Sequence, residues 1–180
     1  MDHSENAIAD TRRWLERAVI GLNLCPFAKA VLVKEQVHFA AAAAEDPLED
    51  FERELDALLA LTAQERDTTL LVLPQGCEDF YDFIGLVARA ERVVRKRKLE
   101  GVVQVASFHP RFTFAGVEED DITNHTNRAP WPTLHLLREE SMDRAVAAFP
   151  DAASIYETNM ETMRRLGPEG WEALDVGAKP

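Results

Sequence analysis

Two short apolar runs, at 102–108 and 133–137, stand on either side of a long polar connection. The connection holds roughly two dozen residues, and compact domains seldom contain so long a loop unless it is functional or disordered. Its composition, mostly His, Asp, Asn, Thr, Arg and Pro together with Trp131, argues against a flexible linker. We therefore expect the two apolar runs to be strands and the connection to carry a functional site.

The size and composition of the chain favour one globular domain. With 180 residues, 46% of them hydrophobic, the chain is long enough to bury a core. We predict a single domain over 1–166. Because Gly and Pro dominate from Gly167 on, we predict a loose tail over 167–180, with Trp171 as the residue that would pin it.

Charge, hydropathy and cysteine content limit the expected partners and location. A net charge of −12 disfavours non-specific nucleic-acid binding, which needs a basic face. No apolar run approaches the ~20 residues that a membrane span needs, and the polar N-terminus lacks the apolar segment of a signal peptide. Two cysteines, Cys25 and Cys77, are too few for a disulfide scaffold, so we expect a cytoplasmic protein with free thiols. The sequence leaves the oligomeric state open.

Apolar spacing predicts helices, and the clearest is the one at 46–62. There Asp46 is expected to cap the helix and Pro47 to begin it, with Leu55 in the middle of the apolar stripe. The remaining predicted helices are at 6–22, 78–99, 141–149 and 151–166, the last two separated by Pro150.

Strands are predicted at 31–39, 68–73, 102–108 and 133–137, with a further short one at 112–114. Strands that alternate with long helices indicate crossover connections and at least partly parallel pairing. We predict an α/β fold, with an α+β arrangement also compatible: a mixed sheet of four or five strands covered by helices. A ferredoxin-like two-layer sandwich is the alternative.

Two histidines are candidate catalytic residues. His109 follows the strand before the polar connection, and ligands of open α/β sheets bind beyond the carboxyl ends of strands. His135 lies inside the strand after the connection, on the face opposite to Leu134 and Leu136. Glu139 shares the face of His135 if that strand continues, and it would then orient the imidazole. For both histidines a structural role in the core is the alternative.

Four polar residues are candidate substrate-binding groups. Arg128 carries a planar fork suited to carboxylate or phosphate and precedes a rigid Pro-Trp-Pro stretch; a structural ion pair with an acidic neighbour is the alternative. Asn124 and Asn127 offer orienting amides, although asparagine also stabilises turns. Arg138 falls on the face opposite to His135. We expect Arg128 to share one pocket with His109.

Cys25 is a further catalytic candidate. If Pro26 begins a short helix, Cys25 caps that helix and a thiolate is favoured, whereas at the end of the preceding helix a thiolate is disfavoured. A small buried thiol is the third interpretation. No His-x-x-x-His or Cys-x-x-Cys spacing and no nucleotide-binding loop occurs in the sequence, so it predicts no metal site and identifies no cofactor.

Three segments resemble hallmark segments of an uncharacterised bacterial family. They are Leu24-Cys25-Pro26-Phe27-Ala28, Ala106-Ser107-Phe108-His109-Pro110, and the stretch from Thr126 to Glu139. On these residues the chain is similar to domain-of-unknown-function family fourteen-fifteen, from about Ala9 to about Leu166. Ala129 stands where serine is expected and Trp131 where tyrosine is expected. The family has no assigned activity, so the resemblance implies a bacterial cytoplasmic protein without assigning a reaction.

Three functions are compatible with these residues. The first is a small enzyme acting on an anionic metabolite, with His109 as acid/base, His135 and Glu139 as a second group, Arg128 as anion clamp and Cys25 as nucleophile. The second is a non-catalytic module that binds a metal or a small ligand. The third is a protein-interaction domain whose Pro-Trp-Pro loop makes the contact.

Overall fold

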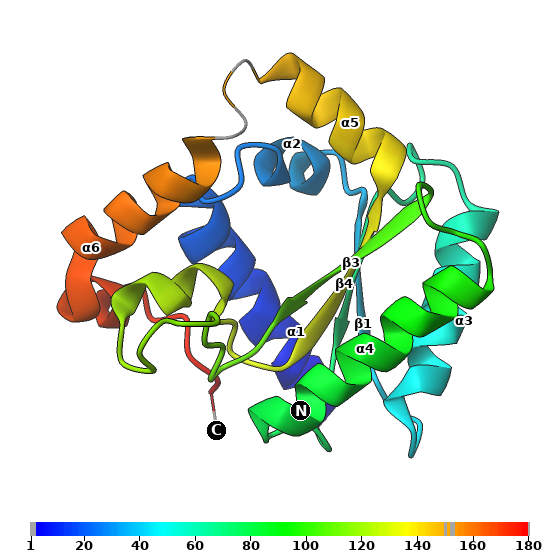
Figure 1. Ribbon diagram of the computed structural model, residues 1–180, viewed down its shortest axis with the longest axis horizontal. Helices are drawn as coiled ribbons and strands as arrows, with labels where there is room; N and C mark the ends of the chain where they lie inside the picture. The colour runs from blue at the N-terminus through cyan, green and yellow to red at the C-terminus, as the bar shows by residue number, and fades with distance from the viewer. Residues whose placement is uncertain (1–2, 150, 152–153, 180) are drawn as a thin grey trace.

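A computed structural model describes residues 3–149, 151 and 154–179 of the 180-residue chain (Figure 1). Its centre is a four-stranded sheet with the strand order β1-β2-β4-β3. β1 pairs with β2 in parallel, and β4 runs antiparallel to both of its neighbours. The predicted α/β class and mixed sheet are therefore confirmed. The strands are β1 Val37–Ala41, β2 Thr68–Val72, β3 Val103–Phe108 and β4 Thr133–Arg138.

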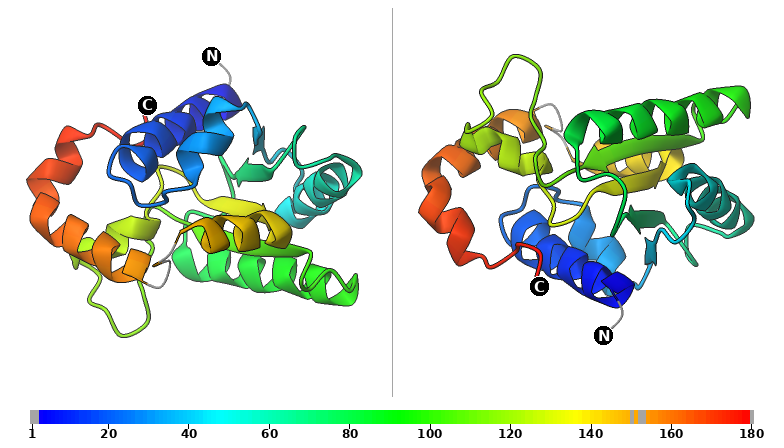
Figure 2. Two further views of the ribbon diagram at one scale, coloured as in Figure 1. Left: turned by 90° about the horizontal axis from the view of Figure 1, so that it is seen from above. Right: turned by 90° about the horizontal axis from the view of Figure 1, so that it is seen from below.

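Helices cover both faces of the sheet, which excludes the two-layer alternative (Figure 2). One face carries α3 (Pro47–Ala60) and α4 (Phe80–Lys96), and the other carries α1 (His3–Trp14) and α2 (Ala28–Val33). No helix in the described part of the chain is long and apolar enough to cross a membrane. The remaining helical elements are the π segment η1 (Leu15–Ile20), the 3-10 helix η2 (Ile122–Asn127), α5 (Glu139–Ala148) and α6 (Ile155–Ala173).

The face under α3 and α4 is a filled core. The stripe predicted from the sequence is buried there: Phe51, Leu55 and Leu58 of α3 have no exposed surface. They pack with apolar side chains of α4 and with Leu134 and Leu136 of β4. As predicted, Asp46 caps α3, accepting a hydrogen bond from the Leu48 N–H at 3.1 Å.

A second apolar cluster lies on the opposite face. Trp14 at the end of α1 and Leu15, Ala18 and Val19 of η1 pack against the sheet there. The rings of Trp14 and Phe108 meet edge to face, with centroids 4.9 Å apart. This cluster fixes η1 against β3.

Two predicted strands differ from the observed structure. The apolar run at 31–39 divides into the end of α2 and the start of β1, with a turn at Glu35, whose φ is 58°. Short apolar runs fit a helix or a strand equally well, and periodicity alone does not decide between them. The segment 112–114 is loop rather than strand. Pro150, predicted to separate the last two helices, lies outside the described residues.

The segment from Gly167 on differs from the predicted loose tail. α6 continues to Ala173 through a kink at Gly167, whose φ of 67° favours glycine. Pro168 then lies in the first turn of the second half of α6. Proline has no backbone N–H, but an N–H in the first turn of a helix has no intrahelical partner, so no hydrogen bond is lost. Trp171 packs against His125 with ring centroids 4.9 Å apart. Composition alone did not reveal these contacts, because they are made with distant parts of the chain.

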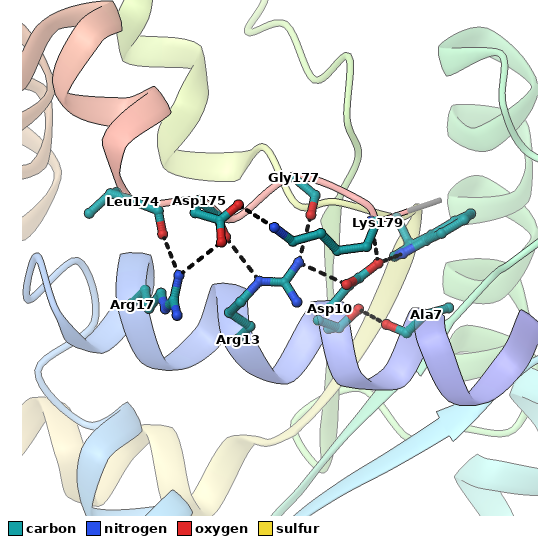
Figure 3. A network of polar contacts seen from close by, with 10 residues as sticks. Ala7, Asp10, Arg13, Arg17, Leu174, Asp175, Gly177 and Lys179 are labelled. Carbon is teal, nitrogen blue, oxygen red and sulfur yellow. Dashed lines mark hydrogen bonds and ion pairs between the residues drawn. The ribbon is translucent and has the colours of Figure 1, made fainter. Parts of the chain in front are cut away.

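Residues 174–179 lie along α1 and are held by side chains of that helix (Figure 3). The Arg13 guanidinium donates to the carbonyl oxygens of Asp175 and Gly177, at 2.9 and 2.7 Å. The buried Asp10 carboxylate accepts from Arg13 Nη2 at 2.8 Å, Trp131 Nε1 at 3.1 Å and the Lys179 N–H at 2.9 Å. One carboxylate thus joins the first helix, the loop before β4 and the C-terminal segment.

The first helix ends in a π segment. The Gly21 N–H bonds to the Glu16 oxygen at 3.0 Å, a five-residue separation in place of the four of an α-helix. A Cβ atom at Gly21 would lie 2.1 Å from the Arg17 oxygen, so glycine is required at this position. The π segment directs Leu15 and Val19 toward the second apolar cluster.

We predict that Leu55→Ala lowers the free energy of unfolding by about 2–5 kcal/mol, as large-to-small changes in a filled core do. Chemical denaturation followed by circular dichroism measures this change. Glu52→Ala on the exposed side of the same helix is the control and should change stability by less than about 0.5 kcal/mol. Equal midpoints for Leu55→Ala and the wild type would contradict the core assignment.

Candidate functional site

The long connection between β3 and β4 is an ordered loop built around Asn124. The Asn124 side chain is fully buried; its Oδ1 accepts from the Phe114 N–H at 3.0 Å and its Nδ2 donates to the Glu118 oxygen at 2.7 Å. Asn127 Nδ2 donates to the Ser107 oxygen at 3.3 Å. Both amides therefore hydrogen-bond to backbone groups of the loop and its flanking strand, as asparagine side chains do when they stabilise turns.

Arg128 also holds the loop. Its Nε donates to the Phe112 oxygen at 3.0 Å and its Nη2 to the Glu119 oxygen at 2.6 Å. Partial burial lowers the pKa of Arg128, and the charge of Glu119 opposes that shift. The side chain lines an open depression of about 450 Å³ whose other walls include three acidic residues, Glu118, Glu119 and Asp120. Arg111 lines the depression as well, but the three carboxylates outnumber the two guanidinium groups, so the lining is negative overall.

We predict that Arg128→Lys destabilises the fold by about 1–3 kcal/mol, because an ammonium group cannot reproduce the fork that spans two carbonyl oxygens. Thermal unfolding measures the change. Arg111→Lys on the rim of the same depression is the matched control, since its guanidinium approaches Glu119 only loosely at 3.7 Å and it is largely exposed. Equal stability of the two variants would show that the Arg128 fork is dispensable.

His109 is fully buried on the α4 side of the sheet. Its Nδ1 accepts from the Arg111 N–H at 3.0 Å, so Nε2 carries the hydrogen and donates to the Cys77 oxygen at 2.9 Å. The rings of Phe80 and Phe83 lie against it, with centroids 5.2 and 5.1 Å away. Burial lowers the pKa of His109, partly offset by the Cys77 carbonyl. Both ring nitrogens are occupied within the protein.

The expectation that His109 and Arg128 share one pocket is not met. The backbone brings the ends of the loop together, since the His109 N–H bonds to the Asn127 oxygen at 3.2 Å. The His109 ring, however, turns into the core under α4 and does not line the depression beside Arg128. Alternation along β3 correctly predicted that His109 lies on the same face of the sheet as Val103 and Val105, but α4 fills that face.

His135 lies on the other face of the sheet, toward α1 and α2. The Thr68 hydroxyl donates to the Leu136 oxygen at 2.7 Å, and Thr68 Oγ1 lies 2.6 Å from His135 Nε2. Because the hydroxyl has one hydrogen, Nε2 must donate to it, and Nδ1 carries the lone pair. No described residue bonds to Nδ1. Burial lowers the pKa of His135 to about 4, so the ring is neutral near pH 7.

His135 and Cys25 line one cavity of about 290 Å³. Its walls are mainly apolar and come from α1, η1, α2, α5 and the sheet; they include Trp14, Phe27, Val37, Leu70, Phe108 and Met142. Both cysteines are free thiols. Cys25 is half-buried, whereas Cys77 is buried, and burial raises the pKa of the Cys77 thiol. Three of the sequence candidates, Cys25, His135 and Arg138, line this one cavity.

Three polar side chains of the cavity lining, Asp67, Ser141 and Arg138, already have partners within the protein. Ser141 Oγ donates to Asp67 Oδ1 at 2.5 Å, which joins α5 to the start of β2. Arg138 donates to the carbonyl oxygens of Leu58, Leu61 and Arg66, at 2.6 to 3.1 Å. Its guanidinium therefore satisfies the C-terminal end of α3, where a cation is favourable.

Glu139 does not reach His135. β4 ends at Arg138, so the strand alternation does not extend to Glu139, which is the first residue of α5. Its N–H bonds to the Val102 oxygen at 3.0 Å. The group that orients His135 is Thr68 on the neighbouring strand β2. Sequence reasoning missed Thr68 because the pairing of β2 with β4 has no local signal.

No group of three or more His, Cys, Asp or Glu side chains able to hold a metal ion occurs in the part of the chain that the structure describes. A site assembled from Cys25, His109 and His135 is not formed, because the two histidines lie on opposite faces of the sheet.

Comparison with known proteins identifies the family. Residues 6–173 match the family model described as a protein of unknown function, DUF1415, and the chain belongs to this family. The match confirms the resemblance to this family. No curated protein matches the chain, and no solved structure matches it.

We predict that His135 makes the free energy of unfolding fall as the pH is lowered. Its folded pKa of about 4 lies below the ordinary value of 6.5, so the unfolded chain binds the proton first as the pH falls. Stability should therefore drop by about 2 kcal/mol between pH 7 and pH 5 through this group alone.

Urea unfolding at both pH values, for the wild type and for His135→Phe, isolates that contribution, because the other histidines titrate in both proteins. The wild type should lose more stability than the variant over this interval. Equal losses would show that His135 is not held neutral by the fold.

Proposed function

We propose that this protein binds a small, mainly apolar molecule in the cavity lined by His135 and Cys25. The observation that carries the proposal is the state of His135. Its ring is neutral, its tautomer is fixed by Thr68, and its Nδ1 has no hydrogen-bond partner among the described residues. An oriented acceptor in an apolar cavity is the arrangement by which small-molecule sites fix their ligands.

The volume of the cavity limits the ligand. About 290 Å³ is the room of about ten water molecules, which suits a ligand of about ten non-hydrogen atoms. Aromatic side chains, among them Trp14, Phe27 and Phe108, form part of the walls and favour a flat, apolar body. His135 Nδ1 adds one requirement, a hydroxyl or N–H group that donates to it.

The same geometry favours an uncharged ligand over the anionic metabolite expected from the sequence. The arginine that lines the cavity, Arg138, is engaged with three carbonyl oxygens, and another lining residue, Asp67, is acidic. His135 supplies no positive charge near pH 7. A buried anion would lack the pairing that compensates its loss of water.

Binding is also favoured over acid/base catalysis. A base whose conjugate acid has a pKa of about 4 is far from the value near the working pH that proton transfer prefers. His109 offers neither nitrogen to a ligand, since both are bonded to the backbone. The non-catalytic small-ligand module is therefore the function that the described contacts support best.

The experiment compares two probes of one shape. The naphthalene ring of 2-naphthol and 2-methoxynaphthalene suits an apolar cavity of this size, but 2-naphthol alone can donate to His135 Nδ1. We expect 2-naphthol to bind about five- to tenfold more tightly, the usual value of one hydrogen bond in an apolar site. Titration calorimetry, or chemical shifts of the residues around the cavity, gives both dissociation constants.

Two variants locate the effect. His135→Phe keeps a ring in place but removes the acceptor, so the preference for 2-naphthol should disappear while both probes still bind. His38→Phe replaces a histidine of β1 that does not line the cavity and should keep the preference. No binding of either probe, or an equal preference in His135→Phe, would refute the proposal.

A further inference from the structure

Five aromatic side chains form one connected series on the surface of the molecule. The first turn of α4 supplies Tyr81 and Phe80, the loop after β3 supplies Phe112 and Phe114, and α6 supplies Tyr156. In this order each ring lies next to the following one, with centroids 4.9 to 6.4 Å apart. None of the five lines the cavity of His135. These side chains form the aromatic strip, a surface separate from the proposed ligand site.

The aromatic strip is exposed at both ends. Tyr81 is 84% exposed and Tyr156 is 55% exposed, and the three phenylalanines between them are partly exposed. The first turn of α4, the loop after β3 and the start of α6 come together at this place, although they are far apart in the sequence (Figure 2). Contiguous apolar side chains on the surface of a soluble protein mark an interaction site.

The surroundings of the aromatic strip are acidic. Segments 78–82 and 109–121, which carry four of the five rings, contain three and four acidic residues and a single basic residue, Arg111. Asp82, next to Tyr81, is exposed. Negative charge around the rings disfavours a polyanion such as nucleic acid and favours a cationic partner. Arginine fits both features, because its planar guanidinium stacks on aromatic rings and pairs with carboxylates.

The spacing of the rings fits an extended chain. Alternate residues of an extended segment point to the same side and lie about 6.6 Å apart. The centroids of successive rings in the aromatic strip are 4.9 to 6.4 Å apart, which is close to this repeat. A segment with arginine at every second position therefore brings one guanidinium to each ring, since the long side chain adapts to the small difference in spacing.

We propose that the aromatic strip binds an extended, arginine-rich segment of a partner protein. The guanidinium groups stack on the rings, and the carboxylates of the flanking segments pair with the N–H groups that stacking leaves free. Tyrosine suits the two exposed ends, because its hydroxyl stays in water while its ring contacts the partner. The net charge of −12 adds a long-range attraction for a basic segment.

The chain has two tyrosines, and both belong to the aromatic strip, so protein labelled with 3-fluorotyrosine gives one fluorine NMR signal for each end. The probe is a peptide of about nine residues in which arginine alternates with serine, one arginine for each ring. Both signals should shift and saturate below about 1 mM peptide. The same peptide with glutamate in place of arginine should shift neither. With lysine it should bind about threefold or more weakly, because an ammonium group lacks the planar face that stacks.

Two pairs of variants locate the binding surface. Tyr81→Ala should weaken binding of the arginine peptide about three- to fivefold, the usual value of one exposed cation–π contact. Val33→Ala, at an exposed apolar residue of α2 outside the aromatic strip, should bind as the wild type does. Asp82→Lys should weaken binding more than Glu91→Lys, which makes the same change of charge at an exposed position further along α4. All four positions are exposed, so the variants should keep the circular dichroism spectrum of the wild type.

Tyrosine signals that the arginine peptide leaves unchanged overturn the proposal, as does equal binding by Tyr81→Ala and Val33→Ala. Equal binding of a glutamine–serine peptide or of an uncharged oligosaccharide, maltoheptaose, also overturns it, because the aromatic strip would then serve an uncharged partner. A dimer of the unliganded protein that Tyr81→Ala dissociates in sedimentation velocity would assign the surface to a second copy of the chain and contradict the proposal as well.

Discussion

The Asp10 carboxylate fixes the first helix to the rest of the fold. A buried charge is costly unless donors surround it, and Asp10 obtains its donors from Arg13, Trp131 and the Lys179 backbone. These residues belong to the first helix, the loop before β4 and the C-terminal segment. α1 and η1 supply Trp14 and Leu15 to the wall of the cavity. The shape of the cavity thus depends on a charge that the cavity itself does not contact.

The sheet gives its two faces different properties. Under α3 and α4, long helices with several fully buried side chains fill the space, and His109 is one of the side chains that fill it. On the other face α2 and α5 contribute no fully buried side chain. The space that they leave is the cavity, and His135 projects toward it from β4. The position of each histidine in the sheet therefore decides whether it serves packing or faces a ligand site.

Local patterns predicted much of this arrangement. Alternation along β4 correctly separated His135 from Leu134 and Leu136, and the cap at Asp46 followed from the preference of aspartate for helix N-termini. What could not be predicted was non-local. The Thr68 partner of His135 depends on which strands pair, and the carbonyl partners of Arg128 depend on how the loop folds back. A sequence pattern locates a polar side chain on a face of an element but does not identify its partner.

The π segment at Leu15–Ile20 has a consequence for how chains of this family are compared. A π turn holds one residue more than the α turn that it replaces, and each residue turns a helix by about 100°. Removal of one residue between positions 15 and 20 would restore a regular α-helix. If Cys25 kept its place, the part of the helix before the deletion would turn about its axis, and Asp10 and Trp14 would no longer face their partners. A single-residue gap at this place in an alignment would therefore mark a member whose first helix presents a different side to the sheet. Glycine at the position of Gly21 would mark one that keeps the π turn, since the Arg17 oxygen occupies the space of a Cβ atom.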